Sequence, residues 1–100
     1  MKVHWTDAAE GHLDSIYAYI ALDSPEYAKR MVDRLTRRSQ QIAAFPLSGR
    51  RVPEYDTDGV REVIEGPFRI LYHIKPDQVD VVAVIHGAMH VLRSGDLEAD

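Results

Sequence analysis

Arginine and histidine side chains in the second half of the chain are the residues best suited to chemistry. Four of them fall in segments with strand-like composition: Arg61, Arg69, His73 and His86. Guanidinium and imidazole groups gathered on one sheet surface could bind phosphate or carboxylate. The alternative is structural, because Glu62 and Glu65 lie where a hairpin would pair them with the two arginines. The sequence is compatible with both a binding surface and structural ion pairs.

Other catalytic arrangements have little support in the sequence. Cys is absent, and no serine lies in a Gly-x-Ser-x-Gly motif. The spacing of His86 and His90 suits a metal only on a helix, whereas a glycine follows His86 at a strand end. No glycine-rich phosphate loop occurs. Three alternating acids without calcium-loop spacing indicate a solvated loop: Glu54, Asp56 and Asp58. We expect neither a metal nor a cofactor.

The first half of the chain must supply a helical hairpin. Val3 and Trp5 predict a short opening strand, and Thr6 or Asp7 offers an N-cap for a helix over residues 7–21. Ser24 and Pro25 begin a second helix, which the Phe45-Pro46 pair ends. Helix-periodic apolar residues give each helix one buried stripe: Leu13, Ile16, Tyr17 and Ile20 in the first, and Ala28, Met31, Val32, Leu35 and Ile42 in the second.

The second half predicts a small antiparallel sheet. Residues 47–59 form a polar connecting loop, and strands follow at 60–64, 68–75 and 79–86 with turns too short for parallel crossovers. Alternation along the middle strand puts these residues on the face under the helices: Phe68, Ile70, Tyr72 and Ile74. The fold class is α+β, with two layers in the order β-α-α-β-β-β. We expect the opposite, half-apolar face to be uncovered and used for a partner.

Length and composition describe an ordinary globular domain. The chain has 100 residues, 45% of them hydrophobic and 28% charged, which is enough for one core and argues against disorder. The apolar run at 81–85 is far too short to span a membrane, and no leader pattern opens the chain, so we expect a cytoplasmic protein. We assign residues 1–93 to a single domain and 94–100 to a flexible acidic tail.

The net charge of −4 conceals an asymmetry. Residues 27–51 contain seven basic residues and one acid, a balance of +6, while the rest of the chain has five basic and 15 acidic residues, a balance of −10. Such a cationic stripe is either a contact surface for an acidic partner or a solvated helix face.

Several motifs resemble the RelE/ParE toxin superfamily across about residues 3–90. WTDAAEGHLDSIYAYI at 5–20 is similar to the first helix of that superfamily, and FPLSGR at 45–50 is similar to the segment after its second helix. The stronger matches are VRE at 60–62, GPFRILY at 66–72 and VIHGA at 84–88, in the order and spacing of the family.

The resemblance implies the RelE/ParE-like fold and a toxin of a bacterial type II toxin–antitoxin module of the plasmid stabilisation type. Its partner would be a cognate ParD-like antitoxin, forming a hetero-oligomer, with no membrane contact and no sequence-specific DNA binding by this chain. The antitoxin's disordered C-terminal segment would lie over the helical hairpin and sheet edge, ordering as it binds. Candidate contacts are Leu13, Tyr17, Arg30, Arg34, Arg37, Arg38 and Arg69.

Two branches of the superfamily differ at the positions that matter for catalysis. RelE-like toxins cut messenger RNA in the ribosome with a Lys and Arg cluster and a C-terminal Tyr, whereas ParE-like toxins inhibit DNA gyrase. Val60 and Glu62 stand where RelE-like chains place lysines, and no Tyr follows Tyr72. These features favour ParE, a growth-inhibiting binding protein without catalytic residues. Met89-His90 departs from the Arg-Asp common in ParE chains.

Two alternatives stay open. One is a ribosome-dependent endoribonuclease, an enzyme that would use a cationic and imidazole set: Arg61, Arg69, His73, His86 and His90. The other is a degenerate toxin that retains only antitoxin binding.

Overall fold

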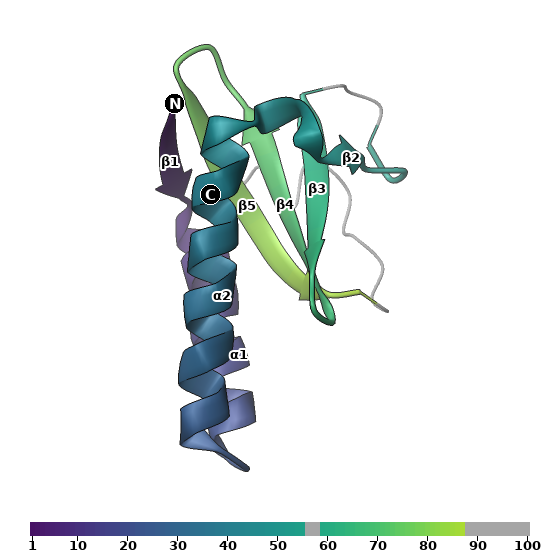
Figure 1. The fold of residues 1–100 in the computed structure, drawn as a ribbon. Coiled ribbons are helices and arrows are strands. Elements are labelled where there is room, and N and C mark those ends of the chain that lie inside the picture. Colours follow the sequence, from purple (N-terminus) through teal and green to yellow (C-terminus); the bar gives the residue numbers. More distant parts are fainter. Residues whose placement is uncertain (56–58, 88–100) are drawn as a thin grey trace.

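The computed structural model describes residues 1–55 and 59–87. The elements follow in the order β1 (Lys2–Trp5), α1 (Asp7–Ala21), α2 (Pro25–Ala44), the 3₁₀ turn η1 (Pro46–Ser48), β2 (Arg50–Arg51), β3 (Val60–Glu65), β4 (Phe68–Ile74) and β5 (Gln78–His86). The α+β class is confirmed, with an α1–α2 hairpin lying against one face of a single sheet (Figure 1). The proposed tail at 94–100 lies outside the described residues.

The sheet is mixed rather than wholly antiparallel. Its strand order is β1-β5-β4-β3-β2, and the β3–β4–β5 meander is antiparallel as predicted. The opening strand β1 pairs parallel with the first half of β5, from Gln78 to Val81. The two strands are separated by most of the chain, so no tight turn imposes an antiparallel pairing on them.

Local capping fixes both helices where the sequence predicts them. The Thr6 hydroxyl accepts a hydrogen bond from the Ala9 N–H at 3.2 Å and donates one to the Val81 carbonyl at 3.0 Å, which joins the start of α1 to the sheet. The Ser24 hydroxyl caps α2 from the N–H of Tyr27. Among the described residues, no helix is long and apolar enough to cross a membrane.

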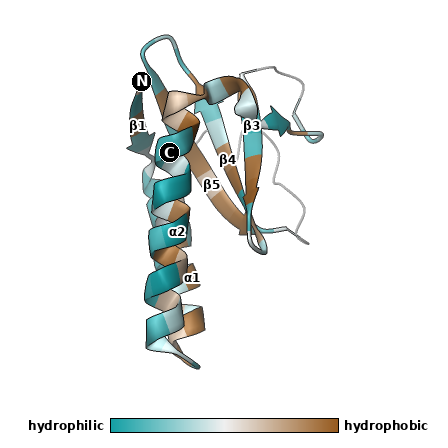
Figure 2. Ribbon diagram, in the orientation of Figure 1, coloured by the Kyte–Doolittle hydropathy of each residue, from teal (hydrophilic) through white to brown (hydrophobic). Residues whose placement is uncertain are grey.

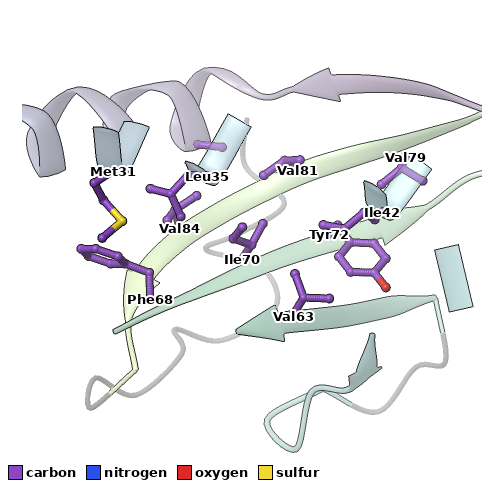
Figure 3. Close-up of a cluster of buried hydrophobic side chains, with 11 residues drawn as sticks. Met31, Leu35, Ile42, Val63, Phe68, Ile70, Tyr72, Val79, Val81 and Val84 are labelled. Atoms are coloured by element: carbon purple, nitrogen blue, oxygen red, sulfur yellow. The ribbon is translucent and has the colours of Figure 1, made fainter. Parts of the chain in front are cut away.

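The main core lies between the helical hairpin and the sheet (Figure 3). Met31, Leu35 and Ile42 of α2 project onto the face of β4 that carries Ile70 and Tyr72, and all five are fully buried. The predicted assignment of this β4 face to the core is therefore confirmed. Burying side chains of this size stabilises the domain by about 1.5–3 kcal/mol each.

The expectation of an uncovered second face was wrong. A second cluster buries that face under the segment after β2: Val52, Tyr55, Val60, Leu71, Val82 and Ala83. The expected loop at 47–59 contains η1 and β2, and Arg50 and Arg51 pair with β3 as a short edge strand. A register shift between β4 and β5 lets both Val82 and Ala83 join this cluster.

Candidate protein-interaction site

One side of α2 carries a row of arginines, which we call the arginine face: Arg30, Arg34, Arg37 and Arg38. Their spacing brings them to one side of the helix, next to the stripe that is buried in the core. In Figure 2 the ribbon of α2 carries several strongly hydrophilic bands along its length. The part of the predicted cationic stripe that lies on α2 is therefore one surface, whereas Arg50 and Arg51 of the same stripe lie on the edge strand β2.

The arginine face borders a shallow hollow of about 200 Å³, lined by Arg34, Arg37, Arg38, Gln41 and Glu65. The Glu65 Oε2 atom accepts hydrogen bonds from the Nε and Nη2 atoms of Arg34 at 3.1 and 2.7 Å. Its Oε1 atom lies 3.8 Å from the Nε of Arg38. One carboxylate thus occupies a site lined by three guanidinium groups, which leaves the hollow with a formal charge of +2.

The turn between β3 and β4 holds Glu65 at this position. Gly66 has a φ of +59°, a conformation that residues with a Cβ adopt at a cost. A Cβ at Gly66 would lie 3.3 Å from the Nη2 of Arg34, so the glycine also allows the guanidinium to approach the turn.

A second group of charges lies on the other face of the sheet, and we call it the Glu62 cluster: Arg50, Glu54, Glu62 and Arg69. The carboxylate of Glu62, 0% exposed, accepts hydrogen bonds from the Nε of Arg69 and the Nε of Arg50, both at 2.6 Å. The Nη atoms of Arg69 donate to the two carboxylate oxygens of Glu54 at 3.2 and 3.3 Å. The cluster ties β2, its following segment, β3 and β4 together.

The pairing of Arg69 with Glu62 confirms the structural interpretation of that arginine. Burial alone lowers the pKa of Arg69, but hydrogen bonds and attraction from Glu54 and Glu62 outweigh it and raise the pKa above its usual value. Its side chain is 8% exposed. Glu54, expected in a solvated acidic loop, is instead an ion-pair partner, while Asp56 and Asp58 lie outside the described residues.

Tyr72 and Gly49 join the end of α2 to the sheet. The Tyr72 hydroxyl donates to the Pro46 carbonyl at 2.6 Å and accepts from the Gly49 N–H at 3.0 Å. Burial raises the pKa of this hydroxyl. A Cβ at Gly49 would collide with the hydroxyl. Arg61 donates to the Gly49 carbonyl at 2.9 Å, and so is also held by this corner.

The four residues of the ribonuclease alternative that the structure describes do not assemble into one site. Arg61 lies opposite Tyr72 and His86 packs edge-on against Phe68, so both belong to the helix-covered face. Arg69 belongs to the other face and is held by carboxylates. His73 is four residues further along β4, about 13 Å away. His90 is outside the described residues, as is the Met89 departure.

One histidine that the sequence analysis did not single out has a defined role. The Nδ1 atom of His12 accepts a hydrogen bond from the Val84 N–H at 3.2 Å, where β5 has run past its pairing with β1. Burial lowers the pKa of His12, in keeping with a neutral acceptor. No local motif could have indicated this contact, because the two residues are 72 positions apart.

The remaining candidate contacts lie toward the tip of the helical hairpin. Leu13 packs against the main core, whereas Tyr17 is 43% exposed. Beyond them, Tyr19 and Leu22 are 77% and 82% exposed. The guanidinium of Arg30 lies 5.8 Å from the centre of the Tyr27 ring, so the arginine face is continuous with an aromatic tip.

Comparisons with known proteins agree with the resemblance in the sequence. Residues 3–91 match the family model described as ParE toxin of the type II toxin–antitoxin system parDE. Toxin RelE2 of Caulobacter vibrioides is 34% identical over 88 residues, covering 87% of this chain and 96% of its own. Y4kP of Sinorhizobium fredii, whose name also describes a toxin, is 36% identical over 87 residues, covering 85% of this chain and 86% of its own.

A solved structure supports the same assignment. A chain of the chromosomal ParDE toxin–antitoxin system from P. aeruginosa superposes with a TM-score of 0.70 at 26% identity, covering 86% of this chain and 95% of that one. The order of elements and the two-layer architecture are therefore shared with a protein of that system. Because the family model matches residues 3–91, nearly the whole of this chain, the chain belongs to the ParE toxin family of type II toxin–antitoxin systems.

Proposed function

We propose that this ParE-family toxin is neutralised by a ParD-like antitoxin and acts by inhibiting DNA gyrase. The observation that carries the proposal is the state of Arg69. It is the strand arginine that a ribonuclease of this superfamily would use, and here it is enclosed by Glu62 and Glu54. A guanidinium neutralised in this way contributes little to stabilising charge on a phosphate.

The residues at the positions where RelE-like ribonucleases carry lysines favour a binding protein over an enzyme, because neither Val60 nor Glu62 supplies the cationic group. General acid–base catalysis supplies about 10²–10⁴-fold of rate, so a site without positioned groups retains near-background activity. Among the described residues, Val60 is buried and apolar, and Glu62 would repel a phosphate. The toxin would then act by occupying its target rather than by turning over a substrate.

The arginine face with Tyr17 is the proposed antitoxin surface. Tyr17, Arg30 and Arg37 are exposed along the helical hairpin, and the other two arginines of the face are half-buried. A segment that orders on binding can wrap such an extended surface. Leu13 and Arg69 would contribute through packing and through the Glu62 cluster, because neither is freely exposed.

A ribosome-dependent endoribonuclease is the second candidate function. It is favoured by one observation, the 34% identity to a protein named Toxin RelE2. In this case histidine would have to replace the missing lysines as acid or base, since imidazole titrates in the required range.

Expression of the free chain in a bacterium distinguishes these functions. Gyrase inhibition predicts filamentous cells with an induced DNA-damage response, and co-expression of the antitoxin encoded beside the toxin restores growth. Rapid arrest of translation would support the ribonuclease, and normal growth would indicate a degenerate toxin. Under the gyrase proposal Arg69→Met changes toxicity only as far as it lowers the amount of folded toxin, so the folded fraction of the variant is measured beside its effect on growth.

A further inference from the structure

We propose that the hollow beside α2 is a carboxylate-binding site that Glu65 occupies in the free toxin, and that an acidic segment of the antitoxin displaces Glu65 on binding. The inference rests on the proposed function only in taking the acidic segment from the antitoxin. The site itself is defined by the residues that line it: Arg34, Arg37, Arg38, Gln41 and Glu65.

The geometry of Glu65 shows which ligand chemistry the hollow accepts. Arg34 approaches one carboxylate oxygen with two nitrogens, an arrangement suited to a planar carboxylate. Arg38 lies 3.8 Å from the second oxygen and donates instead to Gln41 at 3.0 Å. Within the described part of the chain, the hydrogen bond of Arg37 is a long one of 3.4 Å from its Nε to the Asp33 carbonyl of its own helix. A second carboxylate therefore has donors to recruit.

Glu65 is a replaceable occupant. Its side chain is 22% exposed and that of Arg34 is 40% exposed, so their pairing is only partly desolvated. Ion pairs this accessible to water contribute little to stability, so an incoming carboxylate with a better position can replace Glu65. In contrast, the wholly buried Glu62 on the other face of the sheet has no access to a ligand.

The surroundings favour an acidic peptide over a nucleic acid. Outside residues 27–51 the chain carries −10, which opposes an extended polyanion but not a short acidic segment. Phe45 follows Gln41 by about one helical turn, and both it and Leu47 are exposed, at 69% and 72%. A peptide with acidic and apolar residues would pair with the arginines and cover these two side chains.

Fluorescence anisotropy with defined probes tests the site. The probe is a short fluorescein-labelled peptide of alternating Glu and Leu, compared with the same peptide carrying Gln for Glu and with a labelled DNA duplex. We expect Arg37→Gln to weaken binding of the Glu peptide about threefold to fivefold, and Glu65→Gln to tighten it by a similar factor. Arg30→Gln, on the same helix but outside the hollow, should change binding less than about twofold.

The distinctive result is that Glu65→Gln tightens binding of the Glu peptide and not of the Gln peptide, while Asp33→Asn, which removes an acid of α2 outside the hollow, changes binding less than about twofold. A merely cationic surface would gain equally from losing either acid. Unchanged or weaker binding in Glu65→Gln overturns the inference, as does equal binding of the Gln peptide. Tighter binding of the DNA duplex, with the same response to the variants, would make the hollow a phosphate site and also overturns it.

Growth rescue separates this inference from the proposed function. If the antitoxin neutralises the wild type and Arg37→Gln with equal potency at limiting antitoxin, the hollow is not the docking site although the toxin assignment stands. If the antitoxin fails to neutralise the wild type, the proposed function fails whatever the peptide measurements show.

Discussion

Replacing Arg69 by Met tests whether the Glu62 cluster is structural. The change leaves the fully buried Glu62 carboxylate with Arg50 as its remaining ion-pair partner in the described structure. Removing one member of a buried pair costs about 3–5 kcal/mol. Arg50 stays in place but its side chain is 65% exposed, so we expect the lower end of that range, about 3 kcal/mol. For a domain of this size the melting temperature should fall by more than about 12 °C.

A compensating variant distinguishes a charge effect from a packing effect. Glu62→Leu combined with Arg69→Met removes the buried charge together with its partner, so much of the lost stability should return. Arg50 and Glu54 are partly exposed, so water can hydrate both side chains after this change. The control is Arg37→Met on the exposed arginine face, with an expected change within about 0.5 kcal/mol.

Urea unfolding followed by circular dichroism measures all of these variants. The reasoning is refuted if Arg69→Met unfolds within about 1 kcal/mol of the wild type, which would mean that Glu62 gains water or another partner at little cost. It is also refuted if the double variant is less stable than Arg69→Met alone.

Three further predictions concern separate parts of the structure. Burial lowers the pKa of His12 in the folded state, so the contribution of His12 to stability is complete above about pH 6.5 and is lost as the pH falls toward the lowered pKa. The wild type should therefore lose stability over that pH range relative to His12→Asn. Parallel pH profiles of the two proteins in thermal unfolding would contradict this. Gly49→Ala should lower the free energy of unfolding by about 1–3 kcal/mol, measured by urea unfolding, because the alanine Cβ would collide with the Tyr72 hydroxyl. An unchanged urea midpoint would show that the structure around Gly49 adjusts to the methyl group without loss of stability. Charge reversal at Arg34 and Arg37 should slow association with the antitoxin about tenfold at low salt and flatten its salt dependence in stopped-flow measurements, whereas an unchanged rate would make the arginine face a solvated surface only.

The helices and strands were predictable because they follow from local patterns. Ser24-Pro25 and Phe45-Pro46 fix the ends of α2, and alternation along β4 assigns its core face, all within a few residues of the chain. The cationic stripe was also visible in the sequence. Helical spacing alone gathers its α2 arginines on one side of the helix, whereas the positions of Arg50 and Arg51 depend on the pairing of β2 with β3.

The covered second face was not predictable in this way, and of its ion pairs only that of Arg69 with Glu62 was indicated by the sequence. Pairing of β2 with β3, and of Arg69 with Glu54, depends on contacts between residues 10 or more positions apart in a segment that reads as a polar loop. The sequence indicates a pairing of Glu62 with a strand arginine, but the burial of Glu62 depends on the arrangement of β2 beside it. The parallel pairing of β1 with β5 is equally non-local.

A supercoiling assay with purified DNA gyrase tests the proposed function most directly. The chain is titrated against gyrase with relaxed plasmid, with and without the antitoxin, beside a ribosome-programmed messenger RNA cleavage assay at the same concentrations. The proposal predicts loss of supercoiling as the toxin approaches the concentration of gyrase, recovery on adding antitoxin, and intact messenger RNA. Codon-specific cuts in the RNA with normal supercoiling would contradict it and establish the chain as an endoribonuclease.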